Sequence, residues 1–437
     1  MAGRTKSQIR TSSALYYESL FCSDSIFMKK KLLITVGAGA SLDFGLPSVS
    51  AVDTFFDGCA SKSHPLADDP TSNLYRHCRD AINAYYACAP KLELRKWANF
   101  EEVLYQLNLL IPYLSDLHRV HGSNALLTAN SLPEVMHFGR DRKAVDGAVL
   151  GNLTSTLMSE LVNHFIDACA TASTAKAAEI AELGQFLAAL QDEFEIGIIT
   201  LNYDNLFTQA SPGLQTGFDA AGKFDPMSVI ARTDWNFIYH LHGSVHFAMT
   251  GVAHDMHGIT WVATPSKDHT VHATGRNSQD SMEGTTYPMS PFVAGYGKTQ
   301  QILRQPFRTY FAQVNRLVHE ADSLLFLGYG FGDLHLNAAF SEVRDRHRPI
   351  VLVDWADDNQ DPLPFRNDTW SYNLFKALPG DAHAMSSIGH SAPADLGDLR
   401  AARELEVSNN PTYPLAVWYN GMLEACRHPQ KILKHLR

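Results

Sequence analysis

The residues that decide the fold are Leu32 to Val36, which read LLITV, and Gly37 to Ser41, which follow directly and read GAGAS. A short run of apolar and β-branched residues is typical of a buried strand. A glycine-rich segment after such a strand is typical of a nucleotide-binding loop, because glycine lets the backbone approach a phosphate closely. Pro47 and Ser48 are expected to open the next helix. The stretch therefore predicts the first β-loop-α unit of a nucleotide-binding sheet.

Three more apolar runs end in Gly, Asn or Asp, and helical patterns lie between them. The runs span residues 196–200, 323–327 and 350–353, and the helical patterns cover about 148–170, 175–194 and 301–320. Alternation of helices with apolar strands builds parallel sheets, whose ligands bind at the carboxyl ends of the strands. We expect an α/β fold, namely a Rossmann-like doubly wound parallel sheet with a large helical insertion.

The chain divides into three expected segments. They are an N-terminal segment at 1–30, a sheet domain at 31–365 with the helical insertion at about 57–190, and a C-terminal extension at 366–437. Within the insertion, Asn99 stands three residues before Glu102, a spacing that predicts the start of a helix. The extension is expected to be helical around Trp418.

Composition and charge exclude several classes of protein. Of the 437 residues, 45% are apolar and 19% are charged, which excludes intrinsic disorder. The net charge of −10 argues against direct nucleic-acid binding and against a polybasic membrane surface. The six cysteines form no C-x-x-C pair, so neither a disulfide framework nor a thiolate zinc site is expected. With no signal-peptide core and no apolar run of membrane-spanning length, we expect a soluble cytoplasmic protein.

Three candidate chemical groups follow the predicted strands. The loop at Gly37 to Ser41 could hold a diphosphate, although Gly-x-Gly also occurs in ordinary tight turns. His242 could act as a base near neutral pH, or it could be a loop histidine bonded to backbone. Asn202 and Asp204 could orient a ligand, or they could close the strand in an Asx turn. Taken one by one, none of these features decides the function.

Taken in order, the segments resemble the motifs of the sirtuin family. Gly37 to Ser41 followed by Gly45 to Pro47 resembles the sirtuin GAGxS…GIP loop, and Thr200 to Asp204 resembles the TQNID strand end. Leu241 to Ser244 resembles the histidine-glycine motif, and Gly328 to Gly330 falls where sirtuins carry Gly-Thr-Ser. The resemblance implies an NAD-binding catalytic domain at 31–365.

The sequence is more similar to the sirtuin-like NADases of bacterial anti-phage defence, within the Sir2 superfamily. Their later motif commonly reads GYSFGD followed by a histidine, as Gly328 to His335 nearly does, with Gly330 in place of the serine. Deacylating sirtuins usually carry Phe-Arg after the GIP loop and a four-cysteine zinc ribbon. This chain has Ser48 and Val49 there and no cysteine between Cys169 and Cys426. The resemblance therefore disfavours protein deacylation.

The resemblance implies a role for each matching residue. Asn202 would orient the nicotinamide ribose or the attacking water, and His242 would be the catalytic base. Asp354, after the strand at 350–353, would face the adenine ribose, or it could instead cap the turn into Trp355. The residues expected to bind NAD are Gly37, Ala38, Gly39 and Ser41 at the diphosphate, Asp204 at the carboxamide, Gly243 beside the base, Gly328 and Tyr329 on the adenosine side, and Asp354.

The function implied is cleavage of NAD, as a substrate and without a metal, to nicotinamide and ADP-ribose, in an anti-phage effector that depletes cellular NAD. Assembly would gate this activity, through a homo-oligomer or a defence partner such as a HerA-type ATPase. The alternatives are an NAD-dependent protein deacylase and a non-catalytic NAD or ADP-ribose sensing subunit. The histidines between His254 and His272 could bind a metal, but the polar stretch that holds them favours a mobile flap.

Overall fold

A computed structural model describes residues 29–88, 97–114, 132–137, 139–249, 258–269, 279–282, 285–288, 290–343, 346–356, 396–408 and 414–437. At its centre lies a seven-stranded sheet in which every neighbouring pair is parallel except β12 with β13. In spatial order the strands are β12 (Glu406–Val407), β13 (Leu415–Trp418), β11 (Ile350–Val353), β10 (Ser323–Leu327), β1 (Lys30–Val36), β4 (Phe194–Thr200) and β5 (Asn236–His240).

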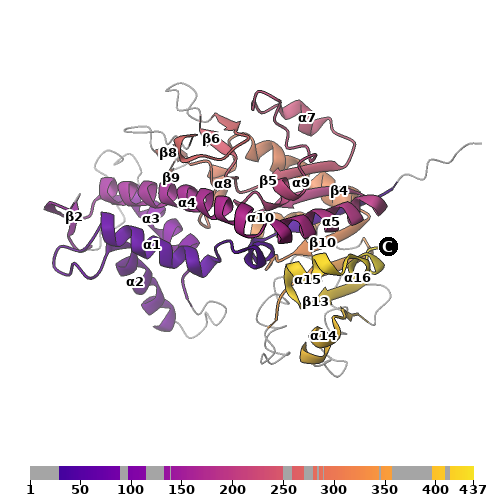
Figure 1. The fold of residues 1–437 in the computed structure, drawn as a ribbon. Coiled ribbons are helices and arrows are strands. Elements are labelled where there is room, and N and C mark those ends of the chain that lie inside the picture. The colour runs from indigo at the N-terminus through magenta and orange to yellow at the C-terminus, as the bar shows by residue number, and fades with distance from the viewer. Residues whose placement is uncertain are drawn as a thin grey trace, which may run out of the picture.

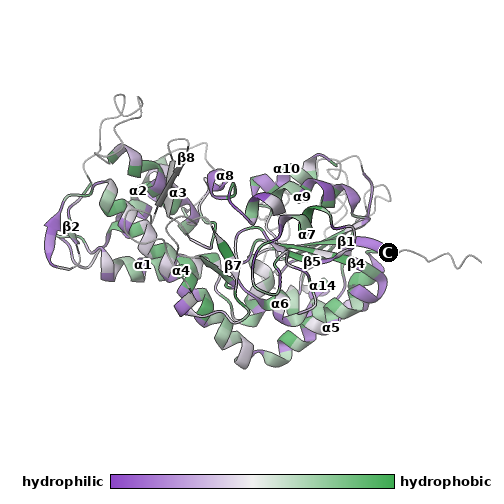
Figure 2. Cartoon of the chain, turned by 90° about the horizontal axis from the view of Figure 1, so that it is seen from above, coloured by the Kyte–Doolittle hydropathy of each residue, from purple (hydrophilic) through white to green (hydrophobic). Residues whose placement is uncertain are grey.

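Helices cover both faces of this sheet (Figures 1 and 2). One face carries α5 (Ala177–Glu193), α15 (Gly421–Arg427) and α16 (Pro429–Lys434), and the other carries α7 (Pro226–Ile230), α9 (Phe307–Glu320), α10 (Leu334–Ser341) and α14 (Leu396–Ala402). Because side chains alternate along a strand, Leu32 and Ile34 belong to one hydrophobic cluster and Leu33 to the other. The expectation of a doubly wound α/β sheet is confirmed.

A helical body lies at one end of the sheet (Figure 1). It contains α1 (Val49–Ser63), α2 (Leu74–Cys88), α3 (Phe100–Leu114), α4 (Gly147–Ala175) and the hairpin of β2 (Val135–His137) with β3 (Asp141–Lys143). The side chains of Ser48 and Asn99 accept hydrogen bonds from the N–H groups of Ala51 and Glu102, each at 3.1 Å, so both expected helix starts are confirmed. The body ends at α4, since α5 packs against β4 as a layer of the sheet.

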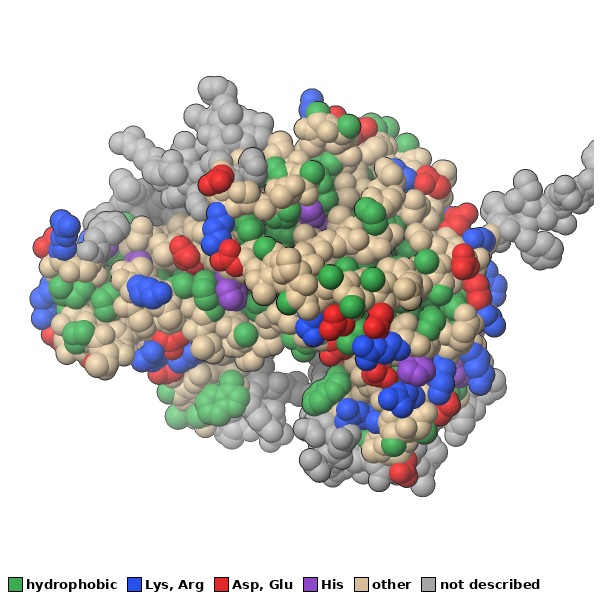
Figure 3. Space-filling view, viewed as in Figure 1, with side chains coloured by type: hydrophobic (Ala, Val, Ile, Leu, Met, Phe, Trp, Pro, Cys, Tyr) green, Lys and Arg blue, Asp and Glu red, His purple; other side chains and the backbone are tan. Residues whose placement is uncertain are grey.

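The expected helix around Trp418 is wrong. Leu415–Trp418 is β13, which pairs in parallel with β11, and the indole N–H of Trp418 donates to the carbonyl of Gly421. A four-residue apolar run buried on both faces has no period that separates strand from helix. The sheet therefore continues past residue 365. The helices after β13 pack on α5, where Arg427 pairs with Glu182 at 2.7 Å; Figure 3 shows charged side chains of both signs over this region.

The helix expected at 301–320 begins later than expected, as α9 at Phe307 with Pro306 as its N-cap residue, and Gln301 instead ends the short helix α8 (Lys298–Gln301). The other elements are η1 (Ala38–Phe44), α6 (Leu206–Ala210), η4 (Lys267–His269) and two hairpins, β6 (Phe247–Met249) with β7 (Ile259–Trp261) and β8 (Gln279–Met282) with β9 (Thr285–Pro288). Of the histidines assigned to a flap, His254, His257 and His272 lie outside the described residues. No helix among the described segments is long and apolar enough to cross a membrane.

Candidate active site

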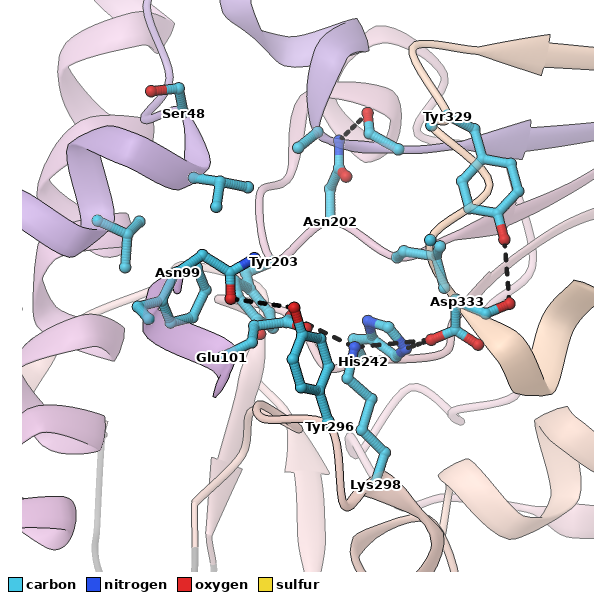
Figure 4. Close-up of a pocket in the computed structure, with 18 of the residues that line it drawn as sticks. Ser48, Asn99, Glu101, Asn202, Tyr203, His242, Tyr296, Lys298, Tyr329 and Asp333 are labelled. Atoms are coloured by element: carbon cyan, nitrogen blue, oxygen red, sulfur yellow. Dashed lines mark hydrogen bonds and ion pairs between the residues drawn. The ribbon is translucent and has the colours of Figure 1, made fainter. Parts of the chain in front are cut away.

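A cavity of about 1,000 Å³ opens at the carboxyl ends of β1, β4, β5 and β10. Since β4 and β5 lie on one side of β1 while β10 and β11 lie on the other, the cavity sits where the strand order reverses, which is the usual ligand site of such sheets. The first turns of α1 and α3 form the opposite wall. Figure 4 shows the side chains of both walls facing one another. The predicted residues that line this cavity are Gly37, Ala38, Ser41, Asn202, Asp204, His242, Gly328 and Tyr329.

The glycine loop packs backbone against backbone with the turn after β10. A Cβ on Gly39 would lie 2.9 Å from the Cα of Gly328, and a Cβ on Gly328 would lie 2.0 Å from the nitrogen of Ala40. The N–H of Gly37 donates to the carbonyl of Leu327 and that of Gly39 to the carbonyl of Gly328. These two N–H groups are therefore committed to the protein backbone and do not face a phosphate in this conformation.

Ser41, Asn202 and Asp204 form one hydrogen-bonded unit that ties the loop to the end of β4. The amide of Asn202 donates to the carbonyl of Gly37 and to the hydroxyl of Ser41, both at 2.9 Å. The Ser41 hydroxyl donates to Oδ2 of Asp204 at 2.6 Å, and Oδ1 of Asp204 accepts from the N–H of Leu206. Burial raises the pKa of Asp204, and these donors oppose the rise. The hydroxyl of Ser41 and the amide of Asn202 therefore already donate hydrogen bonds within the protein, and these bonds hold the glycine loop against the end of β4.

Replacing Ser41 with alanine is expected to lower the free energy of unfolding by about 1–3 kcal/mol, since the buried carboxylate of Asp204 loses a donor and Asn202 loses an acceptor. Urea denaturation followed by circular dichroism measures this change. The matched control is Ser50→Ala on the exposed side of α1, where we expect a change within about 0.5 kcal/mol. Equal stability of the two variants would contradict the hydrogen-bonded unit.

His242 follows β5 and belongs to a buried charged cluster, which we call the His242 array. Its Nε2 lies 3.0 Å from Oδ2 of Asp333, and Nζ of Lys298 lies 3.6 Å from the same oxygen. Nζ of Lys298 also lies 3.3 Å from Oε1 of Glu101 on α3. The next residue, Gly243, has φ +108°, and a Cβ there would lie 2.3 Å from the carbonyl oxygen of Pro291. Gly243 thus supports the turn that aims His242, and it does not line the cavity itself.

The pKa values within the His242 array favour a neutral imidazole. Burial lowers the pKa of His242 and the positive charge of Lys298 lowers it further, while Asp333 opposes both. Burial alone would raise the pKa of Asp333, but His242 and Lys298 hold it well below its usual range. Burial alone would lower the pKa of Lys298, but Glu101 and Asp333 hold it above its usual value. Near pH 7 the array therefore holds an uncharged histidine able to accept a proton.

Tyr329 lines the cavity, and its hydroxyl is bonded within the protein. The hydroxyl donates to Oδ1 of Asn337 at 2.7 Å, and the amide of Asn337 donates to the carbonyl of Phe331. This arrangement fixes the turn between β10 and α10. Figure 4 shows Tyr329 beside Asp333, on the far side of the cavity from α1.

Asp354 does not join the other predicted residues. With Gly39 and Trp355 it lines a second cavity of about 330 Å³, which adjoins the first at Gly328. Oδ1 of Asp354 accepts a hydrogen bond from the N–H of Trp355 at 2.8 Å. This hydrogen bond caps the turn into Trp355, which is the alternative that we weighed against contact with the adenine ribose. Gly39 likewise lines the second cavity and not the first.

Glu101, Lys298 and Asp333 are site residues that sequence reasoning missed. A signal existed for Asp333 alone, because it ends the glycine-rich GYGFGD segment and caps a helix. Glu101 and Lys298 carry no motif and lie about 200 residues apart, so only the fold brings them together. Among the described residues, no group of three His, Cys, Asp or Glu side chains could hold a metal ion.

The fold and the site together define a doubly wound α/β protein with a nucleotide-sized cavity and a buried histidine. Residues 196–374 match the model of the SIR2-like domain, a range that includes Asn202, His242 and Asp333 but not the glycine loop. None of the curated proteins matches the chain.

Solved structures give remote likenesses over most of the chain. A Sir2 homologue in complex with NAD is 12% identical, with a TM-score of 0.35 over 93% of this chain and 91% of that chain. A triple mutant of a Sir2 homologue in complex with 2′-O-acetyl ADP-ribose is 13% identical, with a TM-score of 0.33 over 93% of this chain and 94% of that chain.

Proposed function

We propose that the protein is an NAD glycohydrolase, which cleaves NAD to nicotinamide and ADP-ribose. The observation that carries the proposal is the buried, neutral His242, which faces the cavity across from Asn202 and the glycine loop. The match to the SIR2-like domain over this part of the chain supports NAD as the substrate.

The chemistry needs positioning and a base. The bond between the nicotinamide nitrogen and C1′ of the ribose breaks, and its electron pair neutralises the positive charge of the nicotinamide ring. The oxocarbenium carbon that remains takes the oxygen of a water molecule, whose proton passes to His242. Because the leaving group already carries positive charge, the reaction needs little acid catalysis. Asn202, whose amide also holds the loop, would orient the ribose or the water.

The biological part of the proposal rests on the motifs quoted from the sequence. We propose an anti-phage effector that depletes the cytoplasmic NAD pool. Since uncontrolled cleavage would poison the cell that makes the protein, we propose that a homo-oligomer or a partner such as a HerA-type ATPase gates the activity. Light scattering on the full chain at micromolar concentration tests whether it forms a homo-oligomer. A monomer would contradict the proposed homo-oligomer.

Incubation of the full chain with NAD, followed by chromatography of the products, tests the activity. We expect nicotinamide and ADP-ribose in equal amounts, with the same yield in EDTA, because the proposed chemistry uses no metal. NAD that binds by calorimetry but stays intact in the assembled protein, with its partner where one is required, would overturn the proposal in favour of a sensing subunit. NAD consumption that depends on an added acetyl-lysine peptide would overturn it in favour of a deacylase.

A further inference from the structure

The His242 array joins His242 to three other parts of the chain. Asp333 comes from the turn after β10, Lys298 from α8 and Glu101 from α3 of the helical body. The side chains of His242, Asp333 and Lys298 are each less than one-tenth exposed.

The two oxygens of Asp333 have separate tasks. Oδ1 accepts a hydrogen bond from the N–H of Leu336 at 3.0 Å and so caps α10. Oδ2 faces Nε2 of His242 at 3.0 Å and Nζ of Lys298 at 3.6 Å. The two atoms lie within ion-pair distance but are not aligned as a hydrogen bond; because a carboxylate oxygen can only accept, a proton on Nε2 is the form of the imidazole that suits this contact. Figure 4 shows the other ring nitrogen pointing away from Asp333, toward Asn202.

We propose that Asp333 is a positioning residue that fixes the Nε2–H form of His242, so that Nδ1 is the atom that accepts the proton. Lys298, held by Glu101, keeps the carboxylate of Asp333 in place and keeps the resting imidazole uncharged. This inference rests on the proposed NAD cleavage for its catalytic meaning, whereas the protonated nitrogen of His242 can be observed without any reaction.

The charges of the array support this assignment. Asp333 and Glu101 carry one negative charge each and Lys298 carries one positive charge, so the array with neutral His242 has a net charge of −1. When Nδ1 takes the proton of water, the array becomes neutral. The carboxylate of Asp333 then lies 3.0 Å from the imidazolium and offsets part of the cost of charging a buried ring next to Lys298. Asp333, Lys298 and Glu101 are the charged groups that act on His242 from the β10 turn, α8 and α3.

The variant Asp333→Asn separates the role in the array from the role in the fold. Asparagine caps helices as well as aspartate does, so its oxygen should stay on the N–H of Leu336. Its NH₂ group then takes the place of Oδ2 and donates to Nε2, which forces the proton of His242 onto Nδ1. We expect kcat to fall by about 10²- to 10⁴-fold with little change in KM, and we expect the thermal unfolding midpoint to fall because buried Lys298 loses one of its two carboxylate partners.

The pH profile of kcat/KM gives a second readout. If Asp333 and Lys298 had only a structural role, replacing them would not shift the acid limb of this profile. In the wild type, the rate should stay constant down to below the ordinary histidine pKa of about 6.5, because the pKa of His242 is lowered. Lys298→Met removes a cation, so the acid limb should move to higher pH. Asp333→Asn removes an anion, so the acid limb of its residual activity should move to lower pH.

Nitrogen NMR of the imidazole in protein labelled at histidine completes the test. We expect the proton of His242 on Nε2 in the wild type and on Nδ1 in Asp333→Asn. A wild type with the proton on Nδ1, or a variant with the wild-type rate and pH profile, would overturn the inference while leaving NAD cleavage intact. If no protein cleaves NAD but the NMR result holds, the proposed function fails and the arrangement of His242 stands.

Discussion

Replacement of His242 with alanine is expected to reduce nicotinamide release from NAD by about 10²- to 10⁴-fold, the usual loss when a general base is removed. His242 is 4% exposed, lines the main cavity and has a pKa that burial lowers, so it is neutral at the working pH. Product chromatography measures the loss. Circular dichroism should show an intact fold, because Asp333 keeps Lys298 as a partner and continues to cap α10.

The matched control is His319→Ala. His319 lies on the exposed side of α9, away from the cavity, where its Nδ1 contacts the carbonyl of Asn315. We expect this variant to keep the wild-type rate. If His242→Ala keeps it as well, His242 is not the base, and the proposed mechanism is wrong even if NAD is cleaved.

Gly328→Ala is expected to lower the free energy of unfolding by about 2–5 kcal/mol. Gly328 has φ +55°, a region that costs a residue with a Cβ about 1–2 kcal/mol, and the added Cβ would lie 2.0 Å from the nitrogen of Ala40 and 2.3 Å from the carbonyl carbon of Gly39. Because these neighbours are backbone atoms, they cannot rotate away as a side chain can, and overpacking costs a further 1–3 kcal/mol or so. The glycine loop should shift, so NAD binding should weaken too.

Gly330→Ala provides the control for stability. Gly330 lies in the same turn, but its φ is not in the left-handed region and nothing lies within 4 Å of a Cβ placed there. Urea denaturation should therefore give the wild-type free energy of unfolding for Gly330→Ala. If Gly328→Ala unfolds at the same urea concentration as Gly330→Ala, the close packing of the loop on the turn after β10 is wrong.

The sheet could be predicted from the sequence wherever an apolar run ends in a glycine or a polar residue. LLITV before GAGAS, the run at 196–200 and the run at 323–327 became β1, β4 and β10 with shifts of at most two residues at either end. The strand β13 could not be predicted, because the run at Leu415 to Trp418 is short and buried on both faces.

The candidate site was predicted only where residues follow strands. Asn202 and His242 are each the second residue after β4 and β5, and the carboxyl ends of parallel strands meet at one edge of a sheet. Glu101 and Lys298 reach the cavity from helices whose packing no local pattern specifies. Asp354 also follows a strand, but β11 lies one strand further from β5 than β10 does, so its side chain lies by a different cavity.

A crystal structure of His242→Ala soaked with NAD tests most directly whether the main cavity is the site of NAD cleavage. Without the base, intact NAD should remain bound, with its nicotinamide ribose between Asn202 and the position of the missing imidazole, and with its diphosphate beside the glycine loop. NAD bound elsewhere, or bound with its nicotinamide ribose away from residue 242, would contradict the assignment of this cavity as the active site.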